Sequence, residues 1–262
     1  MNDDAGELRL LVDKALRHTG LVLTRSLALD GAWRCGAASS VYLQLGESYL
    51  AVTCRHVEAG SDLCYVGAAA TEPTMAGLLS MPASDPSWPL VVWTDADIAF
   101  FKADPKRVRA NKREFVDMKA ALPLTREKLP TLASAIITGI WAAESRYEPH
   151  QDAMLFDPFD YTAKGEIVTV DEYEITARFE EHEVVVWDEA QRHKANKIKP
   201  QGASRNLKGM SGSGLWVPVK GGGVALAGIL KGPKTYIGDP LIVFTPIWTI
   251  ASRLAGLFPQ DG

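Results

Sequence analysis

The chain carries a serine between glycines in the stretch Leu207-Lys208-Gly209-Met210-Ser211-Gly212-Ser213-Gly214-Leu215. An apolar run from Leu215 to Val217 follows, which is typical of a β-strand. Glycines permit positive φ angles, and they leave backbone N–H groups free to point into a small concavity that suits an oxyanion. The stretch therefore indicates either a nucleophilic serine beside an anion-binding nest or a Gly/Ser hairpin without chemistry.

The composition favours a soluble cytoplasmic protein. A chain of 262 residues with 47% hydrophobic residues can build a sizeable core, and all-β units of this size are common. The mild net charge of −4 gives no sign of a nucleic-acid or membrane-surface partner. Three cysteines, Cys35, Cys54 and Cys64, favour a reducing compartment over a disulfide-stapled scaffold. The acidic N-terminus is unlike a signal peptide, and no apolar run reaches the length of a membrane span.

Short strands separated by turn residues dominate the pattern, which predicts an all-β sandwich or barrel. Apolar residues at helical spacing predict an amphipathic helix over Leu8 to Leu16, ended by Gly20, and a closing helix over Ile247 to Leu257. The charged segment Asp104 to Lys128 contains a short helix candidate around Lys112 to Ala121. The strand candidates are Val41–Leu45, Tyr49–Thr53, Leu90–Trp93, Ile98–Phe101, Ser134–Trp141, Ile167–Val170, Tyr173–Phe179, Glu183–Trp187, Leu215–Val219, Val224–Leu230 and Leu241–Thr245.

A nucleophilic serine needs a base within hydrogen-bond reach, usually a histidine that a carboxylate orients. His56 ends a strand in Thr53-Cys54-Arg55-His56-Val57, and Asp97 opens the apolar strand Asp97-Ile98-Ala99-Phe100-Phe101. Side chains at strand ends face a cleft more readily than a core. Taken alone, His56 could be a structural histidine and Asp97 a turn residue, with Asp95 as the rival acid.

These three motifs, in the order His, Asp, Ser, resemble the trypsin-like (chymotrypsin-fold) serine peptidases, and most of all their bacterial, disulfide-free branch. The resemblance runs in order from Cys35 to Ile250. It implies two six-stranded antiparallel β-barrels with an N-terminal helix in residues 1–20. The first barrel, with the histidine and the aspartate, would occupy residues 21–110. A linker would follow in 111–133, and the second barrel with the serine and the C-terminal helix in 134–262.

Position by position, the resemblance assigns a role to each motif residue. Ser211 would be the nucleophile, His56 the general base and then acid, and Asp97 the orienting carboxylate. The N–H groups of Gly209 and Ser211 would form the oxyanion hole. Cys54 is expected to be a small buried side chain and not the nucleophile. The resemblance implies an intracellular serine endopeptidase that works through an acyl-enzyme on a protein or peptide substrate, without a cofactor or a metal.

Two departures from the family pattern bear on regulation and specificity. Met210 stands where secreted trypsins carry the aspartate that pairs with a newly cut N-terminus, so control by a partner protein, a ligand or loop ordering is expected instead. Arg205 falls at the base of the primary specificity pocket, and Lys231 replaces a small residue beside the triad aspartate. If Arg205, Lys208 and Lys231 converge, they favour an acidic side chain before the cut; otherwise Lys194 to Lys208 is a solvated basic loop.

The main alternative is a catalytically silent trypsin-fold module that binds a peptide or a partner in the same cleft, for which Met210 and Lys231 leave room. An α/β-hydrolase esterase would need the chain order serine, acid, histidine, which this chain does not have. No His, Cys or carboxylate cluster at metal-ligand spacing and no phosphate-binding glycine loop is present in the sequence. The resemblance also suggests a prokaryotic stress or defence system as the setting.

Overall fold

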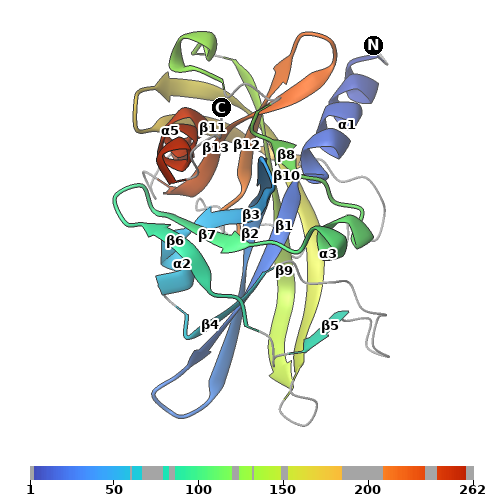
Figure 1. Ribbon diagram of the computed structural model, residues 1–262. Helices are drawn as coiled ribbons and strands as arrows, with labels where there is room; N and C mark the ends of the chain where they lie inside the picture. Colours follow the sequence, from blue (N-terminus) through green and yellow to red (C-terminus); the bar gives the residue numbers. More distant parts are fainter. Residues whose placement is uncertain are drawn as a thin grey trace.

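Two β-sheets form the body of the protein in the computed structural model (Figure 1), which describes residues 3–59, 61–66, 79–82, 86–119, 124–131, 133–148, 153–184, 209–233 and 241–257. The first sheet contains β1 (Thr19–Leu27), β2 (Trp33–Leu45), β3 (Ser48–Cys54), β4 (Leu63–Val66), β6 (Pro89–Trp93), β7 (Ile98–Lys102) and β8 (Val116–Asp117). The second contains β5 (Leu79–Pro82), β9 (Ser134–Glu148), β10 (Ala153–Val170), β11 (Ile175–Val184), β12 (Gly214–Val219), β13 (Gly223–Pro233) and β14 (Leu241–Pro246). The helices are α1 (Asp3–Leu16), α2 (Arg55–Ala59), α3 (Pro105–Ala110), the 3₁₀ helix η1 (Arg126–Lys128) and α5 (Ile247–Leu257).

The second sheet closes on itself, whereas the first one curls without closing through a full ladder. In the order β11-β14-β13-β12-β9-β10, the last strand pairs again with the first, which makes a six-stranded antiparallel barrel. The first sheet runs β4-β1-β2-β3-β7-β6, and its ends approach through a bridge between Cys64 and Ser87. The predicted all-β architecture is therefore confirmed, with one closed barrel and one half-barrel. Strand β5, within the range expected for the first barrel, pairs with β10 of the second sheet.

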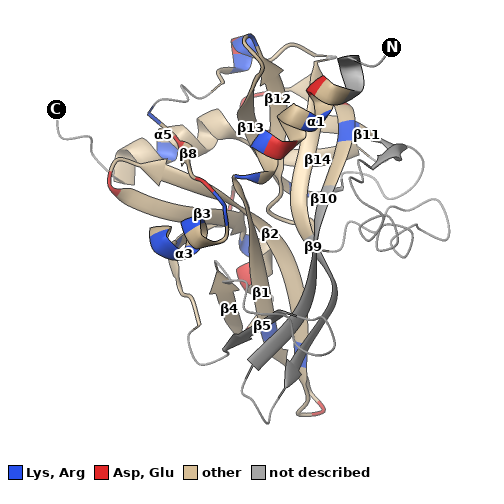
Figure 2. Ribbon diagram, turned by 90° about the vertical axis from the view of Figure 1, so that its right-hand side faces the viewer, with Lys and Arg blue, Asp and Glu red and all other residues tan. Residues whose placement is uncertain are grey.

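The largest core lies between the two sheets and includes both terminal helices. Val52 of β3 and Phe100 of β7 contribute from the first sheet, and Trp216 of β12 and Ile229 of β13 from the second. Helix α1 buries Leu11, Val12, Ala15 and Leu16, as its sequence pattern predicts, while α5 buries Ile247, Ile250 and Leu254. Figure 2 shows charges of both signs on α1 and basic residues on α3, and the buried members of this core are all apolar. Both expected helices are confirmed, and both belong to the core that the two sheets share.

The helix predicted around Lys112 to Ala121 is wrong over its described part. The helix lies earlier, as α3, because Asp104 caps it through a hydrogen bond from the Lys106 N–H at 2.8 Å and Pro105 occupies its first turn. Lys112 has a φ of 56°, which no helix accommodates. Val116 is buried and pairs with β2 as part of β8 instead. The candidate Glu183–Trp187 is no separate strand where it is described, because β11 runs unbroken to Val184; residues 120–121 and 185–187 lie outside the described ranges.

Candidate active site

Three side chains from distant parts of the chain form one hydrogen-bonded series. The Nδ1 atom of His56 lies 2.7 Å from Oδ2 of Asp97, and the His56 backbone N–H donates to Oδ1 of Asp97 at 3.0 Å. On the other side of the ring, Nε2 lies 2.8 Å from Oγ of Ser211. The structure therefore brings together the three residues that the sequence motifs single out, with the histidine in the middle.

Pairing between β3 and β7 puts the histidine beside the aspartate. Cys54 lies opposite Ile98 in this ladder, so the residues just beyond the pair, His56 at the start of α2 and Asp97 before β7, become neighbours. The Arg55 N–H also donates to the Asp97 carbonyl at 3.0 Å. Asp97 has a φ of 54°, a left-handed conformation that non-glycine residues adopt uncommonly and that marks many functional positions.

The turn that carries Ser211 is tied to both sheets. The Ser39 N–H of β2 donates to the Ser211 carbonyl at 2.9 Å, and the Gly212 N–H donates to the Leu230 carbonyl of β13 at 3.1 Å. Gly209 and Gly212 have φ values of 89° and 86°, which only glycine adopts without strain. These bonds fix the serine where the first sheet presents His56 to it.

Met210 has a structural explanation at the position where secreted trypsins carry an aspartate. Its side chain is buried in the core of the second barrel, with Leu215 and Ile137 in the same cluster. A carboxylate in these apolar surroundings would need a charged partner. Within the described part of the chain, the N–H groups of Gly209 and Ser211 on either side of Met210 donate to no acceptor.

The histidine is the most exposed member of the series, and Ser211 and Asp97 are half-buried. The His56 side chain is 48% exposed, whereas that of Asp97 is 22% exposed. A carboxylate that accepts from Nδ1–H fixes one tautomer of the ring, and Nε2 is then left to accept the proton of the Ser211 hydroxyl. The arrangement can therefore remove a proton from a serine that a substrate reaches from solvent.

Cys54 lies next to this series, and its thiol is a hydrogen-bond donor. Its buried thiol lies 2.6 Å from the Leu230 carbonyl, and burial raises the pKa of this thiol well above its usual range. Cys54, His56 and Asp97 offer ligand atoms within 4.8 Å of one another, a grouping that the sequence spacing does not reveal. A metal there would need the thiolate and would displace the bond between His56 and Asp97. The donor set thus fits a proton relay better than a metal centre.

Among the residues expected to set specificity, only Lys231 lies in the described part of the chain. It sits at the bulge of β13 between Leu230 and Gly232 and is half-buried. Burial, the largest effect, raises the pKa of the Cys54 thiol, and the positive charge of Lys231 acts in the opposite direction. Arg205 and Lys208 lie outside the described residues. The convergence of the three cations remains a prediction.

Ser39 supports the site although no sequence motif singles it out. Its fully buried hydroxyl contacts the carbonyls of Gly209 and Ile140 at 3.2 Å each and accepts from the Ile140 N–H at 2.9 Å. Thr53 donates in turn to the Ser39 carbonyl at 2.7 Å. These partners lie more than a hundred residues away from Ser39 in two cases, so only the folded chain brings them together.

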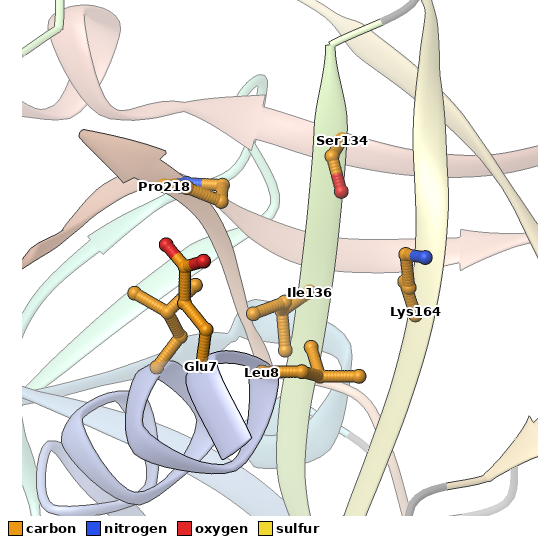
Figure 3. Close-up of a pocket in the computed structure, with 7 residues that line it drawn as sticks. Glu7, Leu8, Ser134, Ile136, Lys164 and Pro218 are labelled. Atoms are coloured by element: carbon orange, nitrogen blue, oxygen red, sulfur yellow. The ribbon is translucent and has the colours of Figure 1, made fainter. Parts of the chain in front are cut away.

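One crevice of about 370 Å³ lies apart from the His56 series (Figure 3). It is lined by Glu7, Leu8, Leu11, Ser134, Ile136, Lys164 and Pro218, between α1 and strands β9, β10 and β12. It shares no residue with the series. Among the described helices, none has the length and apolarity that crossing a bilayer requires.

Comparison with known proteins gives the fold. No protein-family model matches the chain, and no curated protein matches it. Among solved structures, the chain is similar to an HtrA-type protease, AlgW with a tripeptide, at 14% identity and a TM-score of 0.50, over 95% of this chain and 62% of that one. It is equally similar to the serine endoprotease from Yersinia pestis, at 14% identity and a TM-score of 0.50, over 95% of this chain and 65% of that one. The chain thus spans less than two-thirds of each match, and it has the fold of the trypsin-like serine proteases, as the sequence motifs predict.

Proposed function

We propose that the protein is a serine endopeptidase that cleaves peptide bonds with Ser211 as nucleophile, His56 as general base and Asp97 as orienting carboxylate. The observation that carries this proposal is the pair of contacts at His56, 2.7 Å to Asp97 and 2.8 Å to Ser211, on the two nitrogens of one ring. Each contact alone is common in proteins. Both together match what an activated serine requires.

The proposed reaction follows from this geometry. Oγ of Ser211 attacks the carbonyl carbon while Nε2 of His56 takes the hydroxyl proton, and Asp97 stabilises the imidazolium. The oxyanion accepts hydrogen bonds from the N–H groups of Gly209 and Ser211. His56 then gives its proton to the leaving amine, and a water, deprotonated in the same way, hydrolyses the acyl-enzyme. Loss of Ser211 or His56 is expected to cost on the order of 10⁶ in turnover, and loss of one oxyanion donor about 10²–10³.

A peptide substrate suits the strand next to the site. On the β12 side of β13 the ladder ends at the pair Gly214 and Ile229. Beyond it, Lys231 is the bulge residue, and among the described residues Gly232 pairs only with Val243 of β14. An extended peptide can add to a free strand edge through backbone hydrogen bonds. The similar AlgW structure holds a tripeptide. Preference for an acidic residue before the cut, an intracellular site of action and control by a partner remain predictions from the sequence.

Digestion of an unfolded protein substrate tests the proposal. Wild type should produce fragments, and Ser211→Ala should produce none. Ser213→Ala is the matched control, because this second serine of the same motif is buried and, among the described residues, its hydroxyl donates a hydrogen bond only to the Met210 sulfur, at 3.8 Å. Fragments that persist unchanged in Ser211→Ala would contradict the proposal. A peptide that binds folded wild type without being cut would favour the silent binding module.

A further inference from the structure

The turn that presents Asp97 is held by contacts from β14 and α5. Residues Thr94 to Asp97 join β6 to β7, and their own closing bond, from the Asp97 N–H to the Thr94 carbonyl, is long at 3.3 Å. A left-handed φ at a non-glycine residue persists only where its surroundings impose it. This turn therefore depends on contacts beyond its own backbone.

Arg253 of α5 supplies the first of these contacts. Its guanidinium forms a bidentate ion pair with Asp95, here called the fork, with Nη1 2.7 Å from Oδ1 and Nη2 2.5 Å from Oδ2. The guanidinium also lies 5.5 Å from the ring centre of Trp93. An exposed ion pair usually contributes little to stability, but a fork fixes the direction of both side chains. The hydrogen bonds from Arg253 hold the pKa of Asp95 at about 2, so the fork stays charged near neutral pH.

Thr245 of β14 supplies the second contact, on the next residue of the turn. Its hydroxyl donates to the Ala96 carbonyl at 2.7 Å, and both residues are buried. The turn is thus held by contacts at Asp95 and at Ala96, the two residues immediately before Asp97. Both contacts come from the second sheet and the helix that follows it, whereas Asp97 directly precedes β7 of the first sheet.

We infer that Arg253, through Asp95, and Thr245, through Ala96, are positioning residues that hold the Asp97 carboxylate against His56. This inference rests on the proposed function for its effect on catalysis. It makes β14 and α5 part of the structure that completes the site, because the acid is held in place only when both pack against this turn.

Four variants test the inference. Asp95→Asn, Arg253→Gln and the double variant break the fork, and Thr245→Val removes the hydroxyl at nearly constant shape. The measurements are the labelling rate of Ser211 by a fluorophosphonate, the far-downfield NMR resonance of the His56 Nδ1–H proton, and the melting temperature. We expect labelling to slow about 10-fold in each single variant, because small displacements of catalytic groups are costly. The double fork variant should be no slower than either single one, because both remove the same contact.

Two controls separate positioning from general stability. Arg17→Gln removes the ion pair of Arg17 with Glu114, at 3.1 Å, far from the turn in the sequence, and should leave labelling and the resonance unchanged. Thr245→Ser keeps the hydroxyl and should restore both. Folded variants that label at the wild-type rate with an unchanged resonance would overturn the inference, as would equal slowing in Arg17→Gln. If wild type itself is not labelled, the proposed function fails, and loss of the resonance in Asp95→Asn still decides whether the fork positions the acid.

Discussion

A methyl group added at Gly212 should damage the site more than the same change in a comparable turn. An ideal Cβ at Gly212 would lie 2.1 Å from the Ser39 carbonyl oxygen and 2.3 Å from Oγ1 of Thr53. The φ of Gly212 is 86°, so Gly212→Ala also introduces backbone strain. Gly221 is the matched control: its φ is 91°, and a Cβ there would meet nothing within 4 Å. The two alanine variants therefore share the strain and differ in the crowding.

The magnitudes follow from these contacts. Strain of a left-handed residue costs about 1–2 kcal/mol in either variant, and overpacking against backbone adds about 1–3 kcal/mol in Gly212→Ala alone. Since about 1 kcal/mol shifts the melting temperature of a chain of this size by about 2–4 °C, we expect Gly212→Ala to melt about 2–12 °C below Gly221→Ala. Since a shift of about 1 Å at a catalytic group can cost about 10²-fold, Ser211 labelling should slow to that extent in Gly212→Ala.

Urea unfolding and the rate of fluorophosphonate labelling, measured on both variants and wild type, check these values. Gly221→Ala should be labelled as fast as wild type. Gly221 lies in the turn after β12, whereas Ser211 lies just before the start of this strand. Equal stability of the two variants together with wild-type labelling in Gly212→Ala would refute the reasoning, since it would mean that the Ser211 turn does not lie against Ser39.

Three further measurements concern titratable side chains. Because Arg253 lowers the pKa of Asp95 to about 2, the ion pair stabilises the folded state above about pH 4, and this contribution is lost as the pH falls through 2. The difference in the free energy of unfolding between wild type and Asp95→Asn, measured in urea, should therefore shrink over that pH range. Burial lowers the pKa of His18, whose ring stacks on Trp216 with 5.5 Å between the ring centres. Below about pH 6.5 the unfolded state therefore binds more protons than the folded state, and the free energy of unfolding should decrease as the pH falls. His18→Gln should remove this pH dependence. Burial raises the pKa of Cys54, so iodoacetamide should leave it unmodified in the native protein and should not reduce the labelling of Ser211, whereas modification accompanied by lost labelling would implicate the thiol.

The sequence predicts the three site residues because each one carries a local signal. His56 follows an apolar strand, Asp97 precedes one, and Ser211 lies between glycines whose positive φ values the structure confirms at Gly209 and Gly212. Strand ends and glycine turns are short-range features, so they can be read without knowing the partners. What this pattern could not give is the distance between the side chains, which depends on the pairing of β3 with β7.

The misplaced helix shows how one local signal can override another. Asp104 followed by Pro105 is a capping pair that begins α3 at Pro105. From the sequence, the helix of this charged segment is predicted later, around Lys112. Supporting contacts were beyond prediction for a different reason. Ser39 meets Gly209 across 170 positions and Arg253 meets Asp95 across 158, and no local pattern distinguishes such residues from others of their type. Likewise, strand number alone does not say whether a sheet closes.

Fluorophosphonate labelling of the purified protein, with the adduct located by mass spectrometry, tests the central claim most directly. The reagent needs an activated serine and an oxyanion site but no knowledge of the substrate. The account predicts one adduct on Ser211 in wild type, none in Ser211→Ala, and almost none in His56→Ala. A folded wild type that takes no label, or an adduct that forms equally well in His56→Ala, would contradict it.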